Sequence, residues 1–297
     1  MYQEFFSLRE APFSITPDTE YFYAYRSHQE ALNTLLVALR SGEGFIKISG
    51  EVGTGKTLLC RKLLDALQEG YLTAWLPNPQ LNDKALRHAV AEELGLTLPR
   101  NIGQHRLLKQ LTEYLIQRQA EGRQAVLLID EAQALPEESL EAVRLLTNLE
   151  TRKRKLLQVV LLGQPELDRL LERSSLRQLK QRITFSYRLR PLDREGMPDY
   201  ILHRLRKAGY NGPPLFSRGA LRLLYRASGG VPRLINILCH KTLMLAFGKG
   251  QRQITRRQAL RAIRDTEGVR QPWFIERFGL LGLGCSCLFA AVYFRGW

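Results

Sequence analysis

One eight-residue segment limits the folds open to this chain more than any other feature. Residues 50–57 read GEVGTGKT, which fits the pattern GxxxxGK[ST]. An apolar run of the β type at residues 44–49 precedes the segment, and a helical pattern at residues 57–67 follows it. Glycines let the backbone wrap around a phosphate, and the N–H groups of the loop and of the helix N-terminus face its negative charge. The segment therefore predicts a loop that binds the phosphates of a nucleotide.

Each residue of this loop has an expected part in phosphate binding. The Lys56 ammonium would reach the β- and γ-phosphates, and the Thr57 hydroxyl would ligate Mg²⁺. We expect the following residues to hold the nucleotide: Gly50, Glu51, Val52, Gly53, Thr54, Gly55, Lys56 and Thr57. The loop thus predicts a magnesium nucleotide as the ligand.

Two adjacent carboxylates follow another apolar run. Residues 125–129 read AVLLI, and a run without polar alternation is typical of a strand buried on both faces of a parallel sheet. Asp130 and Glu131 come next, at the carboxyl edge of the sheet, where ligands bind in such folds. Asp130 would hold Mg²⁺ through water, and Glu131 would polarise a water for attack on the γ-phosphate. A solvated pair of loop carboxylates is the simpler alternative, and the phosphate loop upstream argues against it.

Strands and helices alternate through the first two thirds of the chain. Besides the two runs above, runs of the β type are found at residues 71–76, 156–162 and 183–189. Helical patterns separate these runs, which predicts βαβ units. We therefore expect an α/β fold with a five-stranded parallel sheet and helices on both of its faces.

The pattern changes after Pro191, where no further strand is evident in the sequence. Four helices are predicted there, with Gly- and Pro-rich segments between them, at about 194–208, 217–227, 231–247 and 255–266. The second part of the chain is therefore expected to be an all-helical domain.

Positive charge is concentrated in this helical part. The whole sequence has a net charge of +15, and residues 190–270 hold 17 Lys and Arg against 5 Asp and Glu, a net charge of +12. Such an excess predicts an anionic partner besides the nucleotide, either a phospholipid surface or DNA. No recognition-helix pattern and no interleaved aromatic residues single out DNA.

The C-terminal tail contains an uncharged run. Residues 278–294 have no charged side chain, and as a helix these 17 residues would span about 26 Å, the lower limit for a bilayer core. Trp273 and Trp297 lie at the two ends of the run, as interfacial anchors would. The run predicts a single transmembrane helix, with the preceding domains in the cytoplasm because the basic residues precede it. A buried C-terminal helix, in a cytoplasmic or peripheral protein, is the alternative.

Seven segments together resemble AAA+ ATPases, and the resemblance runs from about residue 1 to 268. They read FSLREAPF (6–13), GEVGTGKT (50–57), LIDEAQ (128–133), RLLTNLE (144–150), LGQPEL (162–167), QRI (181–183) and SGGVPRLIN (228–236). The chain is most similar to the ExeA/GspA/MshM group, which contains secretion ATPases and pilus biogenesis ATPases. Within that group the overall pattern is most similar to the MshM type, which serves the MSHA pilus.

The resemblance implies roles for further residues. Gln164 would be the sensor 1 residue that positions the attacking water, and Arg233 would be the sensor 2 arginine that contacts the γ-phosphate. Asn78 resembles the polar residue that restrains the catalytic glutamate, although the Pro-Asn-Pro segment is also simply a turn. Arg182 resembles the arginine finger that one subunit offers to its neighbour's nucleotide, with Arg177 as the alternative. A finger acts in trans, so it implies a homo-oligomer.

The resemblance also gives each part of the chain an expected place. Residues 1–40 would border the nucleotide site, 41–191 would be the AAA+ core, 192–268 the helical lid, and 269–297 the tail. His28 would either border the adenine or be a surface histidine.

The implied function is that of an oligomeric ATPase with ATP and Mg²⁺ as cofactors. It would couple ATP hydrolysis to the assembly of a type IV, MSHA-like pilus or of a secretion apparatus at the bacterial inner membrane. Its partners would be the assembly proteins and the anionic lipids of that membrane. The alternative is a nucleotide-gated DNA-binding protein of the transposition or replication-initiation type, and the uncharged tail favours the first hypothesis.

Overall fold

The computed structural model describes residues 2–68, 70–99, 102–151 and 154–271. The described residues divide into two compact units: an α/β unit within residues 17–191, and a helical unit to which residues 2–16 and 192–271 belong. Residues 1–40, expected as one segment, are therefore divided between the two units.

A five-stranded parallel sheet forms the centre of the α/β unit, in the order β2-β3-β4-β1-β5. The strands are β1 (Phe45–Gly50), β2 (Tyr71–Leu76), β3 (Gln124–Ile129), β4 (Leu157–Gly163) and β5 (Phe185–Leu189). This result confirms the predicted five-stranded parallel sheet. Because β1 and β3 both pair with β4, the residues that follow β1, β3 and β4 meet at one carboxyl edge of the sheet.

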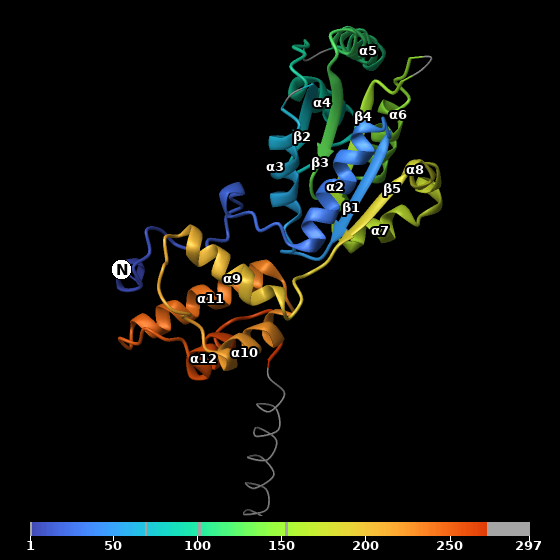
Figure 1. The fold of residues 1–297 in the computed structure, drawn as a ribbon. Helices are drawn as coiled ribbons and strands as arrows, with labels where there is room; N and C mark the ends of the chain where they lie inside the picture. Colours follow the sequence, from blue (N-terminus) through green and yellow to red (C-terminus); the bar gives the residue numbers. More distant parts are fainter. Residues whose placement is uncertain (1, 69, 100–101, 152–153, 272–297) are drawn as a thin grey trace, which may run out of the picture. The chain divides into compact units, whose positions relative to one another are not determined.

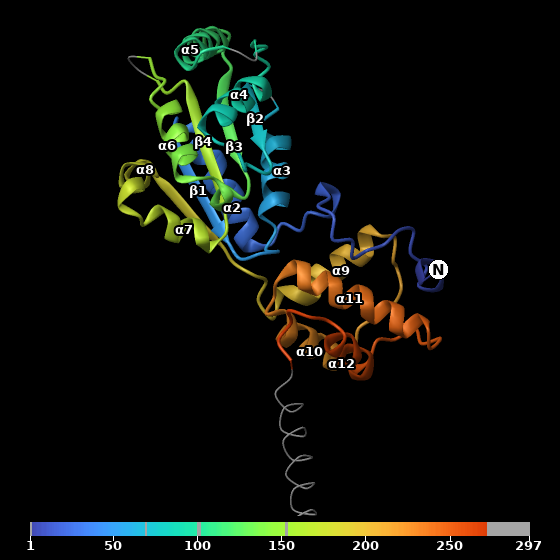
Figure 2. The same cartoon turned by 180° about the vertical axis from the view of Figure 1, so that it is seen from behind.

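Helices cover both faces of the sheet, as predicted (Figures 1 and 2). They are α2 (Arg26–Arg40), α3 (Lys56–Ala66), α4 (Asp83–Glu93), α5 (Gln104–Ala120), α6 (Glu137–Leu146), α7 (Pro165–Leu171) and α8 (Arg177–Arg182). In β3, Val126 and Leu128 belong to the core formed with α2 and α3, whereas Leu127 and Ile129 belong to the core on the opposite face. Since successive side chains of a strand point to opposite faces, burial of both faces explains the unbroken apolar run.

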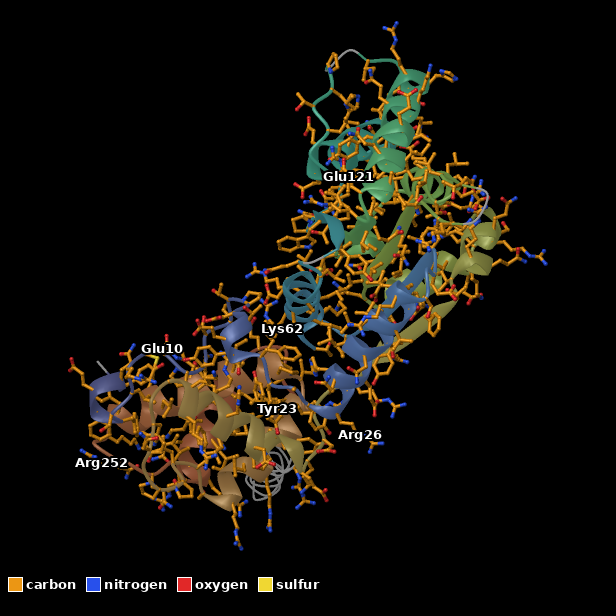
Figure 3. The ribbon with its side chains drawn as sticks, turned by 45° about the horizontal axis from the view of Figure 1, so that its top comes forward. Glu10, Tyr23, Arg26, Lys62, Glu121 and Arg252 are labelled. Carbon is orange, nitrogen blue, oxygen red and sulfur yellow. The ribbon has the colours of Figure 1, made fainter. Side chains whose placement is uncertain are left out.

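The helical unit contains the four helices expected after Pro191. They are α9 (Gly196–Lys207), α10 (Arg218–Ser228), α11 (Pro232–Phe247) and α12 (Arg256–Arg264), with α1 (Tyr2–Phe5) packed on α11. At one end of this unit the Arg252 guanidinium lies over the Phe5 ring, 5.4 Å from its centroid (Figure 3).

A buried arginine ties the N-terminal segment to α9 and α11. The Arg204 guanidinium, only 5% exposed, donates from Nε to the Pro12 carbonyl at 2.5 Å and from Nη2 to the Ser14 carbonyl at 3.3 Å. Asn236 of α11 donates from Nδ2 to the same Ser14 carbonyl, and its Oδ1 accepts from the Tyr200 hydroxyl. These bonds satisfy carbonyls of an irregular segment, which explains why residues 2–16 belong to the helical unit.

Two glycines set the start of α11. Gly229 and Gly230 both have positive φ, +59° and +79°. A β-carbon added at Gly230 would lie 1.9 Å from the Leu192 carbonyl oxygen, and the Leu192 N–H donates to the Gly230 carbonyl at 2.9 Å. Only glycine fits there, so the Gly-Gly pair fixes the backbone that leads into Pro232 and Arg233.

The membrane prediction falls outside the part of the chain that the structure covers. Across residues 2–271, apart from their short gaps, no helix combines the length and the apolar character needed to cross a bilayer. The predicted span at 278–294 lies beyond the described residues.

Candidate nucleotide-binding site

The phosphate loop connects the central strand β1 to α3. Gly53 and Gly55 have φ values of +78° and +101°, a backbone region that other residues rarely adopt. A β-carbon added at Gly55 would also lie 2.9 Å from His28 Nε2, and one added at Gly50 would lie 2.9 Å from Thr54 Oγ1. The three glycines therefore allow a tight turn at the N-terminus of a helix, the backbone arrangement that cradles phosphate.

His28 is buried against this loop. Its Nε2 lies 2.9 Å from the Thr54 carbonyl oxygen, and because a carbonyl only accepts, Nε2 carries the hydrogen. Burial lowers the pKa of His28, and the hydrogen bond to Thr54 partly opposes that shift. The ring Nδ1 is buried without a hydrogen-bond partner in the described structure. His28 is thus not a surface histidine but a support of the phosphate loop.

Lys56 opens α3 and lies in the mouth of the loop. The side chain is 4% exposed, and Nζ donates to the carbonyls of Gly50 at 2.8 Å and Glu51 at 3.1 Å. Burial lowers the pKa of Lys56, whereas the negative charges of Glu131 and Asp130 raise it. The ammonium is therefore held among loop carbonyls and carboxylates, from which it can turn to a phosphate.

The two predicted metal ligands are in contact. Thr57 lies in the first turn of α3, and its hydroxyl donates to the Asp130 carboxylate at the end of β3. Asp130 is 1% exposed; burial raises its pKa, and the hydrogen bonds from Thr57 and from the Glu131 N–H lower it. The Glu131 N–H lies 2.9 Å from Asp130 Oδ1.

This donor set fits Mg²⁺ bound together with a nucleotide. Among the residues that the structure covers, no three His, Cys, Asp or Glu side chains gather into a metal site made of protein alone. Mg²⁺ is commonly held by one or two protein oxygens together with substrate phosphates and waters. Thr57 and Asp130 would supply those protein oxygens.

Glu131 has an unusual backbone and two amide partners. Its φ and ψ are +50° and +40°, in the left-handed region that non-glycine residues seldom occupy. Its Oε2 accepts from Gln164 Nε2 at 2.8 Å and from Gln133 Nε2 at 2.5 Å. The predicted sensor 1 residue and the predicted catalytic glutamate are therefore brought together, because β3 and β4 are neighbours.

Gln133 was not predicted as a site residue. It lies in a short 3₁₀ turn, Ala132–Ala134, and its Oε1 accepts the backbone N–H of Gln164 at 2.9 Å. The segment LIDEAQ contained it, but an amide two residues after a carboxylate has no distinctive period or spacing. Only the tertiary contact identifies it.

The structure places Asn78 apart from this network. Asn78 is exposed in the loop after β2, and within the described residues no hydrogen bond joins it to Glu131. The two amides that do contact the glutamate are those of Gln133 and Gln164.

The two candidates for the arginine finger differ in their surroundings. Arg182, the last residue of α8, donates from Nη1 to the Thr147 hydroxyl at 3.1 Å and to the Arg144 carbonyl at 3.3 Å. Those groups end α6, where a cation is favoured by the helix dipole. Arg177 is exposed at the start of α8 and makes no hydrogen bond or ion pair that we find in the described chain. A role in trans for Arg182 would require it to leave the end of α6.

Arg233 lies in the first turn of α11, in the helical unit. Its side chain is exposed and has no carboxylate partner among the residues of known placement. A cation at the positive end of a helix is electrostatically unfavourable.

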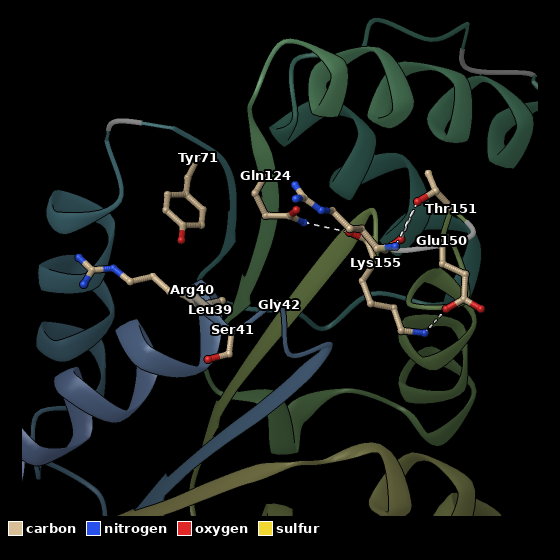
Figure 4. A pocket seen from close by; sticks show the side chains of 10 residues that line it. Leu39, Arg40, Ser41, Gly42, Tyr71, Gln124, Glu150, Thr151 and Lys155 are labelled. Carbon is tan, nitrogen blue, oxygen red and sulfur yellow. Dashed lines mark hydrogen bonds and ion pairs between the residues drawn. The ribbon is translucent and has the colours of Figure 1, made fainter.

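A separate cavity of about 750 Å³ opens at the amino ends of the strands (Figure 4). It is lined by Leu39, Arg40, Ser41, Gly42, Tyr71, Gln124, Glu150, Thr151, Arg154 and Lys155. Tyr71 and Gln124 begin β2 and β3, so this cavity is at the edge of the sheet opposite the phosphate loop. No predicted site residue lines it.

The parallel sheet, the glycine loop and the Thr57–Asp130 contact define an α/β P-loop NTPase. Residues 39–171 match the model of the AAA domain family. The chain is 42% identical over 297 residues to general secretion pathway protein A of Aeromonas hydrophila, a match that covers 100% of this chain and 54% of that protein. The chain therefore spans about half the length of this relative.

Solved structures share the fold. The ORC2 protein of Aeropyrum pernix matches with a TM-score of 0.63 at 18% identity, over 84% of this chain and 70% of that one. Cdc6p of Pyrobaculum aerophilum matches with a TM-score of 0.63 at 19% identity, over 88% and 70% of the two chains. RuvB of Thermotoga maritima matches with a TM-score of 0.55 at 16% identity, over 81% and 68%. At these identities the likeness supports the P-loop NTPase fold alone.

Proposed function

We propose that this chain is an oligomeric AAA+ ATPase that couples Mg-ATP hydrolysis to the assembly of a cell-surface machine. The observation that carries the proposal is the convergence of Lys56, Thr57, Asp130 and Glu131 at the carboxyl edge of the sheet. Lys56 would bind the γ-phosphate, Thr57 and Asp130 would hold Mg²⁺, and Glu131 would activate the attacking water. A bound Mg²⁺ would neutralise charge that develops on the phosphates.

The machine would be a secretion apparatus or a type IV pilus of the MSHA type. The 42% identity to general secretion pathway protein A supports the secretion class. The sequence pattern of the MshM type supports the pilus. Assembly proteins of such a machine would be the partners, and the subunits would form a ring or another oligomer in which a finger arginine acts in trans.

An arginine-rich face on the helical unit supports an anionic partner. Six exposed arginines lie on α10 and α12, at spacings of three to four that place each set along one side of its helix. They are Arg218, Arg222 and Arg226 on α10, and Arg257, Arg261 and Arg264 on α12. Within the described residues, no carboxylate lies within ion-pair distance of any of the six.

We take anionic lipid of the inner membrane as that partner. The chain leaves α12 between the two helices: the Arg270 N–H donates to the Ala227 carbonyl of α10, and Gln271 Nε2 donates to the Ile263 carbonyl of α12. The uncharged run of residues 278–294 follows within a few residues. A bilayer that received this run would lie within reach of the arginine face and would attract it. DNA binding is the competing function, since duplex phosphates would satisfy the same arginines.

Hydrolysis by the full-length protein in lipid nanodiscs tests the proposal. We expect Lys56→Ala to lower the ATP hydrolysis rate by at least about 100-fold, because it removes the phosphate contact. Glu131→Gln should bind ATP and retain it unhydrolysed. Lys62→Ala is the matched control, because Lys62 lies on the same helix (Figure 3) and its ammonium pairs with Asp65, 3.9 Å away; this variant should keep full activity. Undiminished hydrolysis by purified Lys56→Ala protein would refute the site.

A further inference from the structure

Both the nitrogen and the oxygen of the Gln133 amide form hydrogen bonds with candidate catalytic residues. Its Nε2 donates to Glu131 Oε2 at 2.5 Å, and its Oε1 accepts the backbone N–H of Gln164 at 2.9 Å. The side-chain amide of Gln164 donates to the same Glu131 oxygen at 2.8 Å. The orientation of the Gln133 amide follows from chemistry, since a carboxylate only accepts and a backbone N–H only donates. The three residues thus form a closed ring of hydrogen bonds.

The local backbone is shaped to bring this ring together. The left-handed conformation of Glu131, at φ +50°, turns the chain sharply out of β3 and into the short turn that holds Gln133. A non-glycine residue in this region costs about 1 kcal/mol or more, so the surrounding contacts must compensate. At the end of β4, a β-carbon added at Gly163 would lie 3.1 Å from Gln133 Oε1 and 2.6 Å from Leu167 Cδ2. Glycine at 163 therefore leaves the space into which the Gln133 amide fits.

The two amides that hold Glu131 differ in how freely they can leave it. In the described structure a single side-chain hydrogen bond, from Nε2 to Glu131, holds the Gln164 amide, so this side chain can rotate toward a γ-phosphate, a charged acceptor as the Glu131 carboxylate is. Gln133 is anchored through the backbone N–H of Gln164, which cannot rotate away because it belongs to the junction of β4 and α7. If a nucleotide drew the Gln164 side chain away, the Gln133 amide would be the donor that stays on Glu131.

We propose that Gln133 is a positioning residue that keeps the Glu131 carboxylate aligned during hydrolysis, after the Gln164 side chain has turned to the nucleotide. This inference rests on the proposed ATPase function and adds a residue to it. Gln133 touches neither substrate nor metal in this role; it acts through Glu131. Its loss would leave the carboxylate free to rotate, and a misplaced catalytic group lowers the rate of the chemical step without weakening substrate binding.

One substitution of Gln133 in the full-length protein tests this role by separating kcat from KM. Gln133→Met keeps the length and flexibility of the side chain and removes both hydrogen bonds. We expect it to lower kcat for ATP hydrolysis about 10- to 100-fold and to leave KM and the affinity for ATP within about twofold of wild type. Gln124→Met is the matched control, because Gln124 is also partly buried and donates only to carbonyls at the opposite edge of the sheet, such as that of Lys155 at 3.3 Å. It should leave kcat unchanged.

The outcomes separate this inference from the function on which it rests. Wild-type kcat in Gln133→Met, or a parallel loss of ATP affinity in that variant, would overturn the positioning role while the ATPase function stood. If the wild-type protein showed no ATP hydrolysis that is lost in Lys56→Ala, the proposed function would be overturned, and the inference with it.

Discussion

The hydroxyl of Thr57 donates a hydrogen bond to the carboxylate of Asp130. This bond joins the first turn of α3 to the end of β3, two elements that are far apart in the sequence. It brings together two oxygens that would bind Mg²⁺. Contacts within the α/β unit therefore hold the two candidate metal ligands side by side.

Removal of the hydroxyl should weaken Mg²⁺ binding specifically. We expect Thr57→Ala to raise the Mg²⁺ concentration for half-maximal ATP hydrolysis by at least about tenfold, because one ligand and the orientation of Asp130 are lost together. A titration of activity with Mg²⁺ at saturating ATP measures this shift. Thr112→Ala is the control, since the Thr112 hydroxyl donates only to the Leu108 carbonyl within α5. An unchanged Mg²⁺ midpoint in Thr57→Ala would argue against the ligand assignment.

The buried His28 should make stability depend on pH. Burial lowers its pKa in the folded protein below the ordinary value of 6.5. At pH values below 6.5 the unfolded chain therefore binds a proton that the folded ring refuses, and the free energy of unfolding falls as the pH is lowered. Urea unfolding at pH 7.5 and pH 5.5 should show a smaller decrease in His28→Gln than in wild type. The exposed His105→Gln should show the wild-type decrease; an equal effect of the two variants would contradict the prediction.

Mixing experiments should show whether Arg182 acts in trans. An Arg182→Ala oligomer lacks the finger and a Glu131→Gln oligomer lacks the catalytic carboxylate, so each alone should be inactive. Each subunit retains the group that the other lacks. If the finger works across an interface, mixed oligomers should recover a measurable fraction of ATP hydrolysis. Arg177→Ala in the same mixture is the comparison, because Arg177 is exposed and has no bonding partner that we find among the described residues, whereas Arg182 is bonded to the end of α6. Recovery with Arg177→Ala, and full activity of Arg182→Ala alone, would assign the finger to Arg177.

The Gly-Gly pair before α11 should be sensitive to a single methyl group. Gly230 has positive φ, and the methyl group of Gly230→Ala would lie 1.9 Å from the Leu192 carbonyl oxygen. We expect this substitution to lower the free energy of unfolding of the helical unit by about 3 kcal/mol. Gly250→Ala also has positive φ, +62°, but meets no atom within 4 Å. That variant should lose only about 1 kcal/mol, the strain of the backbone alone. Chemical denaturation followed by circular dichroism measures both, and similar losses would refute the steric argument.

The arginine face should respond to lipid charge. In nanodiscs, we expect anionic lipid to raise the rate of ATP hydrolysis above the rate in neutral lipid, and Arg222→Glu with Arg261→Glu to abolish that difference. Arg106→Glu with Arg123→Glu, at two exposed arginines of the α/β unit, changes the net charge by the same amount and is the control. This variant should still hydrolyse ATP faster in anionic than in neutral lipid. Stimulation by duplex DNA in place of anionic lipid, lost in the same α10–α12 variant, would favour the alternative function.

Several site residues could be predicted because their signals are local. The loop at residues 50–57 is contiguous, and its glycines, lysine and threonine have fixed spacing. Asp130 and Glu131 could be found because they directly follow an unbroken apolar run. Gln164 was placed at the end of another such run, although its contact with Glu131 required the order of the strands.

Other features depend on contacts between distant segments and left no periodic signal. Gln133 becomes significant only because β4 lies beside β3 and brings the Gln164 N–H to its amide. The sequence resemblance offers Arg182 to a neighbouring subunit, yet in the structure its side chain is bonded to the end of α6. His28 could not be separated from a surface histidine until α2 was seen packed against the loop.

The sequence by itself therefore determined the class of fold, the phosphate loop and the carboxylates at the end of β3, because apolar periodicity and a contiguous motif are local properties of a chain. The tertiary structure decided which side chains hold the Glu131 carboxylate, which of the two candidate arginines is bonded within the α/β unit, and to which unit residues 2–16 belong. Those outcomes depend on the order of strands in the sheet and on individual hydrogen bonds between segments. Such long-range pairings follow from the packing of the whole unit, which no short stretch of sequence specifies.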